Sequence, residues 1–189
     1  MPIEKHDFLT HYYVDEPFRT ISDLTLSQTE QVLAEIAKRR ELEFRLSKSD
    51  YLPRRRRIEQ AMRRGFIAKN GKPRREHPHY MILGAFAPWE EARRKITIPL
   101  SAFSSNVLRF TLTDSFFAYS ERNLRGVAIP SRPYYRQVFR LEELDELIAK
   151  YGLPGERRQH ETRHVFDVYV EAQVWDDEPL RGYVGPTTR

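Results

Sequence analysis

Residues 50–66 read Asp50-Tyr51-Leu52-Pro53-Arg54-Arg55-Arg56-Arg57-Ile58-Glu59-Gln60-Ala61-Met62-Arg63-Arg64-Gly65-Phe66. The apolar residues recur every three or four positions, which is the period of one face of an α-helix. Asp50 suits the cap before the first turn, and a proline is tolerated within that turn. The pattern predicts a helix with an apolar stripe toward the core and with most of its arginines facing outward. The stripe consists of Leu52, Ile58, Ala61, Met62 and Phe66.

A strand is predicted soon after this helix. Asn70 and Gly71 form a turn signal, and Pro78 keeps the residue before it extended. Residues 79–83 then read as a short apolar strand. The clearest strand comes later, at residues 166–175, where two kinds of side chain alternate. One face is apolar (Phe166, Val168, Val170, Ala172 and Val174), and the other is mixed (Asp167, Tyr169, Glu171, Gln173 and Trp175).

The other predicted elements lie on both sides of the basic helix. Residues 1–26 contain several aromatic residues and predict an N-terminal arm that packs on the body. A capping-box pattern at Ser27 and Glu30 predicts the start of a first helix, which should end near residue 50. Further strands are predicted at residues 95–100, 107–113 and 137–139, a loop at 120–135, and a helix at 141–151 that Gly152 and Pro154 end.

These patterns predict one α+β domain over residues 1–189. Two N-terminal helices should pack on a mostly antiparallel sheet of four or five strands, with one helix inserted before the last strand. The chain has no cysteine, which excludes disulfides and thiolate sites. It has neither a long apolar run nor a signal-peptide pattern, so we expect a cytoplasmic protein that has no membrane partner.

Positive charge is concentrated in one part of the chain. Residues 38–75 hold fifteen basic and four acidic residues, a net charge of +11, whereas the rest of the chain carries −6. Such a patch attracts anions and can bind phosphate groups. The alternative is a solvated helix face whose arginines pair with acids elsewhere in the chain. The candidate phosphate-binding residues are Arg56, Arg57, Arg63, Arg64, Arg74, Arg75, His77 and Tyr80.

Two residues are candidates for catalysis. Glu171 lies on the mixed face of the last strand, where several polar groups need partners or a cleft. In a cleft, this carboxyl group suits acid–base chemistry, with His79 at the start of the earlier strand as a hydrogen-bond donor. The alternative for Glu171 is a sheet face that solvent wets or that arginines cover. Asp114 and Ser115 favour a turn after a strand, and no pattern makes Ser115 a nucleophile.

We predict no metal site. His77 and His79 would share one face of an extended segment, but a third ligand is not evident. His160 and His164 match the H-E-x-x-H pattern of zinc enzymes, yet no apolar-backed helix fits between Gly155 and the last strand. The sequence also lacks a glycine-rich dinucleotide motif and a P-loop, and it indicates no particular cofactor.

Two resemblances follow from short motifs. The chain resembles a family of uncharacterised bacterial proteins over nearly its whole length, through residues 8–13, 17–19, 78–84 and 171–179. That resemblance implies no activity. More distantly, the layout is similar to small ADP-ribosyltransferase domains. This likeness implies an NAD site formed by His79, by Ser115 or Tyr119, and by Glu171, although Tyr80-Met81 replaces the family's usual residues after the histidine and Gln173 follows Glu171 instead of preceding it.

Three functions are compatible with these patterns. The first is binding of RNA, DNA or a nucleotide through the basic helix face. The second is an enzyme that acts on a nucleotide or phosphorylated substrate with Glu171 as acid, base or charge stabiliser. The third is a structural protein whose arginines contact an acidic protein partner. Glu171 on an open sheet surface, far from any cleft, would remove the second.

Overall fold

A computed structural model describes residues 7–38, 51–90, 93–120, 123–124, 127–128, 132–153 and 169–184. The predicted cap at Asp50, the end of the first helix and the pair His160 and His164 lie outside these ranges. Within the described ranges, no helix is both long enough and apolar enough to cross a membrane.

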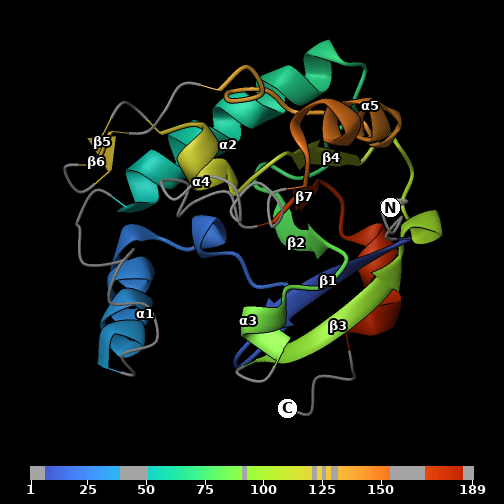
Figure 1. The fold of residues 1–189 in the computed structure, drawn as a ribbon. Coiled ribbons are helices and arrows are strands. Elements are labelled where there is room, and N and C mark those ends of the chain that lie inside the picture. The colour runs from blue at the N-terminus through green and yellow to red at the C-terminus, as the bar shows by residue number, and fades with distance from the viewer. Residues whose placement is uncertain are drawn as a thin grey trace.

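The described strands form a five-stranded antiparallel sheet and a separate two-stranded ribbon (Figure 1). The order in the large sheet is β3-β1-β2-β7-β4, so strands distant in sequence lie side by side. Within the segment expected to form an N-terminal arm, residues 8–13 form strand β1 of this sheet. The bounds are β1 Phe8–Tyr13, β2 His79–Leu83, β3 Arg94–Pro99, β4 Leu108–Thr111 and β7 Glu171–Val174, with β5 Asn123–Leu124 and β6 Val127–Ala128 in the ribbon.

Helices of different lengths accompany the sheet, and the predicted α+β class is confirmed. The α-helices are α1 Leu26–Lys38, α2 Tyr51–Ala68, α3 Ala87–Glu90, α4 Ser115–Ala118 and α5 Leu141–Tyr151. The 3₁₀ turns are η1 Ile21–Asp23, η2 Leu100–Ala102 and η3 Glu178–Tyr183. As predicted, α5 precedes the last strand, and Gly152 ends it with a positive φ of 73°.

The two faces of the sheet differ in polarity. Met81 pairs with Ala172, and this pair lies on the face that forms the main apolar core with α5 residues Leu144 and Ile148. Tyr80 pairs with Gln173 and Ile82 with Glu171, and because side chains alternate, these lie on the opposite face. That polar face lies under α2 and α4 (Figure 1).

The apolar stripe of α2 is confirmed except at Ala61, which is half-buried, and it explains why the helix lies on the sheet. Leu52, Ile58, Met62 and Phe66 are buried. The Phe66 ring stacks on buried Trp175 at 5.7 Å between ring centres. Each such burial contributes about 1.5–3 kcal/mol, so this stripe fixes which residues of α2 face the sheet.

Arg109 closes the C-terminal end of α2. The side chain is 2% exposed, its Nη2 donates to the main-chain carbonyl of Lys69 at 2.8 Å, and its guanidinium lies 4.4 Å from the centre of the Phe66 ring. A helix leaves its last carbonyls without partners, and this arginine satisfies one of them.

Several local predictions need correction. The first helix begins at Leu26, because Thr25 and Gln28, rather than Ser27 and Glu30, form the reciprocal capping bonds. Both helices were expected to pack on the sheet, but α1 projects away from it in Figure 1, and its Leu26 and Val32 are exposed.

Three smaller predictions also differ from the structure. Leu141, expected on the buried face of α5, is 41% exposed because it occupies the first turn. The predicted loop at residues 120–135 contains the β5–β6 ribbon. The strand predicted at residues 137–139 reduces to a single bridge between Phe139 and Phe110.

Candidate active site

A cleft of about 340 Å³ opens on the polar side of the sheet. Strands β1, β2 and β7 form its floor, the first turn of α2 forms one wall, and Trp89 of α3 with Arg93 forms another. Its lining combines a carboxyl group, two guanidinium groups and several aromatic rings. The lining residues are Thr10, His11, Tyr12, Tyr51, Arg55, Tyr80, Met81, Ile82, Trp89, Arg93, Tyr169 and Glu171.

Glu171 is the acidic group of the cleft. It is 5% exposed, and its Oε1 accepts hydrogen bonds from Gln173 Nε2 at 3.0 Å and from the Ser115 main-chain N–H at 3.3 Å. Burial and the negative charge of Asp114 raise the pKa of Glu171 to about 7, against the opposing effects of Arg55, Ser115 and Gln173. The group therefore holds its proton over a range in which an ordinary glutamate has lost it.

Asp114 lies near Glu171 and accepts hydrogen bonds from other groups. It caps α4 by accepting from the Phe116 main-chain N–H at 2.9 Å, which confirms the predicted turn. Its other oxygen accepts from the Tyr169 hydroxyl at 2.9 Å. The two neighbouring carboxyl groups therefore have different hydrogen-bond partners, and the charge of Asp114 raises the pKa of Glu171.

Arg55 is the buried cation of the cleft. Its side chain is 10% exposed, and the guanidinium lies 3.9 Å from the centre of the Tyr80 ring. Nε donates to Glu59 at 3.2 Å and Nη1 to the Ser115 hydroxyl at 3.3 Å. Burial opposes its charge, but Tyr80, Tyr51 and Glu59 keep the pKa of Arg55 well above its ordinary value. Arg55 and Glu171 therefore both bind Ser115 and line the same cleft.

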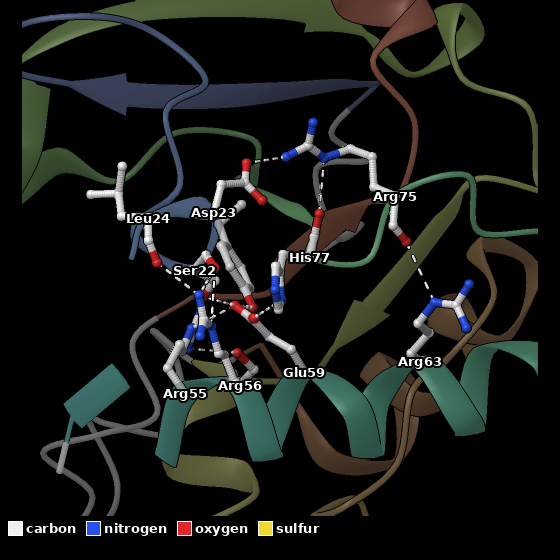
Figure 2. A network of polar contacts seen from close by, with 11 residues as sticks. Ser22, Asp23, Leu24, Arg55, Arg56, Glu59, Arg63, Arg75 and His77 are labelled. Carbon is white, nitrogen blue, oxygen red and sulfur yellow. Dashed lines mark hydrogen bonds and ion pairs between the residues drawn. The ribbon is translucent and has the colours of Figure 1, made fainter. Parts of the chain in front are cut away.

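Glu59 holds Arg55 and Tyr80 in place from behind. This carboxylate is fully buried, and Ser22, Arg55 and Tyr80 all donate to its Oε1, at 2.8, 3.2 and 2.8 Å. His77 Nδ1 lies 2.7 Å from its Oε2. Figure 2 shows Glu59 pointing from α2 into this group of donors. Burial alone would raise the pKa of Glu59, but the bonds from His77 and Tyr80 and the charge of Arg55 lower it, so Glu59 remains ionised.

Aromatic rings form the other walls of the cleft. The Trp89 ring contacts Tyr12 edge-on at 5.7 Å and Tyr169 at 5.5 Å between ring centres. At the start of α2, Tyr51 stacks on Phe116 of α4, with 5.4 Å between ring centres. The Arg93 guanidinium lies 5.1 Å from the Trp89 ring centre. A planar ligand with a negative group would find both apolar faces and cations here.

His79 lies in a different cleft from Glu171. Residues 79 and 80 point to opposite faces of β2, and the register puts Glu171 on the Tyr80 face. His79 Nε2 lies 2.7 Å from Asp177 Oδ1, in a second cleft of about 360 Å³ that Phe18 and Leu180 also line. The two candidate catalytic residues thus lie on opposite faces of the sheet. Of the residues implied by the ADP-ribosyltransferase likeness, Ser115 contacts Glu171 and His79 does not.

The two neighbouring histidines have separate partners. His77 binds Glu59, whereas His79 binds Asp177, so they do not form one site. Strand β2 starts only at His79, and the expected alternation does not extend back to His77. Across the described ranges, no group of three or more histidines and acids is arranged to hold a metal ion.

Most of the candidate phosphate-binding arginines make bonds within the protein (Figure 2). Arg56 donates to the carbonyls of Ser22 and Leu24, and Arg63 donates to carbonyls of residues 73 and 75. Arg75 pairs with Asp23 and Asp177, and Arg74 pairs with Asp176. Arg57 and Arg64 are exposed, and neither has a side-chain partner in the described part of the chain.

Sequence reasoning missed Arg55 and Glu59, although a signal was present. Residues 55, 59, 62 and 66 follow one another at spacings of four, three and four, so they lie on one side of a helix. Met62 and Phe66 had been placed in the stripe, and the same period includes the two charged residues. A buried arginine and glutamate four residues apart can neutralise each other.

Comparison with known proteins gave no match to a family model, to a curated protein sequence or to a solved structure. The two resemblances therefore remain expectations, and the functional argument depends on the geometry of the cleft.

Proposed function

We propose that this protein is an enzyme that carries out acid–base chemistry on a nucleotide or another small phosphorylated compound. The observation that carries the proposal is that Glu171 and Arg55, both buried and both bound to Ser115, line one cleft with aromatic walls. Buried titratable groups with shifted pKa values in a cleft are typical of active sites.

Each part of the ligand has a counterpart in the cleft. Arginine binds phosphate oxygens well because its planar N–H groups match their geometry. Arg55 uses Nε and Nη1 within the protein, and Nη2 has no partner among the described residues. The rings of Trp89 and Tyr51 offer surfaces on which a base can stack. A phosphate and a base would thus both find a place.

Glu171 is suited to move a proton in this reaction. A general acid works best when its pKa is near the working pH, and burial brings this carboxyl group to about 7. Its Oε1 is held by Gln173 and Ser115, whereas Oε2 has no hydrogen-bond partner within the described residues. Oε2 would therefore give a proton to the substrate or take one from it.

The test is a screen followed by a matched pair of variants. Nucleoside monophosphates, nucleoside diphosphates and sugar phosphates would be tested for binding by calorimetry and for conversion by ³¹P NMR. In Glu171→Gln, conversion of the active compound should fall by about 100- to 10,000-fold while binding persists. Glu76→Gln is the control, because Glu76 is exposed and outside the cleft.

Three results would contradict the proposal. Conversion that survives in Glu171→Gln would remove the role of this carboxyl group. Failure of every compound to bind to the wild type, or equal binding after Arg55 is replaced, would remove the phosphate site. For Arg55 the variant is Arg55→Met combined with Glu59→Gln, which avoids leaving a buried charge unpaired.

Binding of a nucleic acid through α2 is the second candidate, and the exposure of Arg57 and Arg64 favours it. They lie seven residues apart, so they share one side of the helix. Reversal of both charges should weaken binding of RNA or DNA and reduce its salt dependence. A fluorescence titration at low and moderate salt would measure this, and unchanged affinity in the double variant would refute it.

A further inference from the structure

The arrangement around Ser115 joins a cation and a proton carrier. Arg55 Nη1 donates to the Ser115 hydroxyl, and the Ser115 main-chain N–H donates to Glu171 Oε1. A negative group that binds to Arg55 from the cleft must therefore lie near the Glu171 carboxyl group. Two negative groups that lie close together repel each other strongly in a site with little water.

This conflict can be relieved by a proton. If Glu171 is protonated, its Oε2 becomes a hydrogen-bond donor to the same anion that Arg55 holds. The anion then gains a second donor instead of a repulsive neighbour. An ionised Glu171 would instead neutralise Arg55 and exclude the anion.

We propose that the cleft binds an oxyanion together with one proton, with Arg55 pairing with the anion and protonated Glu171 donating a hydrogen bond to it. This inference rests on the proposed function and specifies the ligand as an anion with an oxygen acceptor. The step is a proton transfer alone: Glu171 Oε2 takes its proton from solvent, and no other covalent bond forms or breaks.

The other groups near Glu171 act on its protonation in opposite directions. Asp114, at the start of α4, is held by Tyr169 and Phe116 and adds negative charge, which favours the protonated form of Glu171. Gln173 on β7 and Ser115 on α4 donate to Oε1, which opposes protonation.

The remaining charged and titratable neighbours come from other elements. Arg55 on α2 opposes protonation until an anion takes up its charge. Tyr80 on β2 donates its proton to Glu59, and burial raises its pKa well above the ordinary value, so it stays neutral. Burial lowers the pKa of His11 on β1 to about 4, so it too is uncharged near neutral pH. Tyr51, Tyr12 and Arg93 complete the lining.

The test uses naphthalene-2-sulfonate as the probe. It combines a flat ring with an oxyanion whose charge is constant between about pH 5 and 9, so any proton taken up comes to the protein. Calorimetry in two buffers of different ionisation enthalpy would give the number of protons bound with the probe. At about pH 8 we expect uptake of nearly one proton, and an affinity that falls about tenfold for each pH unit above 7.

Three variants separate the possible explanations. Glu171→Gln keeps a donor in place without a titrating group, so the probe should bind with no proton uptake and with an affinity independent of pH. Asp114→Asn should move the loss of affinity to lower pH, because it removes the charge that helps Glu171 keep its proton. Gln60→Ala, an exposed change on the same helix, should leave both quantities unaltered.

The outcomes distinguish this inference from the function on which it rests. Binding that needs Arg55 but takes up no proton would overturn the role of Glu171 and leave the anion site intact. Proton uptake that persists in Glu171→Gln would assign the proton to another group and also overturn the inference. Absence of probe binding at about pH 6, where Glu171 holds its proton, would refute the anion site and with it the proposed function.

Discussion

Replacing Glu171 with glutamine should stabilise the protein above neutral pH. In the folded state, burial and Asp114 raise the pKa of Glu171 from 4.5 to about 7. The unfolded chain therefore loses this proton first, and stability falls as the pH rises from about 4.5 to 7. Each pH unit corresponds to about 1.4 kcal/mol, so ionising Glu171 costs the folded state about 3 kcal/mol at most. Glutamine removes this cost.

Denaturant unfolding of wild type and Glu171→Gln at about pH 4 and pH 8 would measure the effect. The two proteins should have similar free energies of unfolding at the lower pH, where Glu171 is protonated in both the folded and unfolded states. At the higher pH the variant should be more stable by up to about 3 kcal/mol, although it has lost activity. Comparing the two proteins at each pH cancels the titration of all other groups.

Glu59→Gln gives a matched contrast to Glu171→Gln, because Glu59 is a buried carboxylate that binds Arg55 and Tyr80 of the same cleft. Glu59 is also buried, but four donors surround it and its pKa is lowered, so its charge stabilises the fold above its unfolded pKa. Its replacement should destabilise the protein at about pH 8 by several kcal/mol. A Glu171→Gln variant no more stable than wild type at that pH, or a difference that does not change with pH, would show that the fold does not hold Glu171 in its protonated form.

Three further predictions concern His11, Arg109 and Asp114. His11 accepts a hydrogen bond from the Phe18 N–H, and burial lowers its pKa from 6.5 to about 4. The wild type should therefore lose up to about 3 kcal/mol of stability as the pH falls between those two values. His11→Gln cannot titrate and should not show this loss in acid unfolding. Arg109→Met leaves the carbonyl of Lys69 unpaired and should lower the free energy of unfolding by about 2–4 kcal/mol in urea, whereas a loss below about 0.5 kcal/mol would contradict the capping role. Asp114→Asn should lower the pKa of Glu171 in an NMR titration, and an unchanged value would assign the elevation to burial alone.

Local patterns in the sequence predicted the elements well where they were decisive. Strand β2 begins and ends at the predicted residues, and α5 runs from Leu141 to Tyr151 because Gly152 stops it. The first helix begins earlier than predicted because Thr25 and Gln28 form a second capping pattern. From the sequence alone, this pattern is as good as the predicted one at Ser27 and Glu30. Such alternatives are settled by local geometry and not by residue type.

The site was only partly predictable. The polar residues on the last strand predicted that Glu171 would need partners or a cleft, and Glu171 does line a cleft. Its separation from His79 depends on the register between β2 and β7, which are almost ninety positions apart in the sequence. Arg55 was passed over because charged residues are usually exposed, and its burial depends on Glu59 and Tyr80, which the fold brings to it.

The most direct test of the account is a ¹³C NMR titration of the Glu171 carboxyl group, assigned by the signal that disappears in Glu171→Gln. The account predicts a midpoint near pH 7 in the free protein and a higher midpoint with naphthalene-2-sulfonate bound, because the anion neutralises Arg55 and favours the protonated carboxyl. A midpoint near the ordinary glutamate value of about 4.5, unchanged by the probe, would show that Glu171 is not the proton carrier of this cleft.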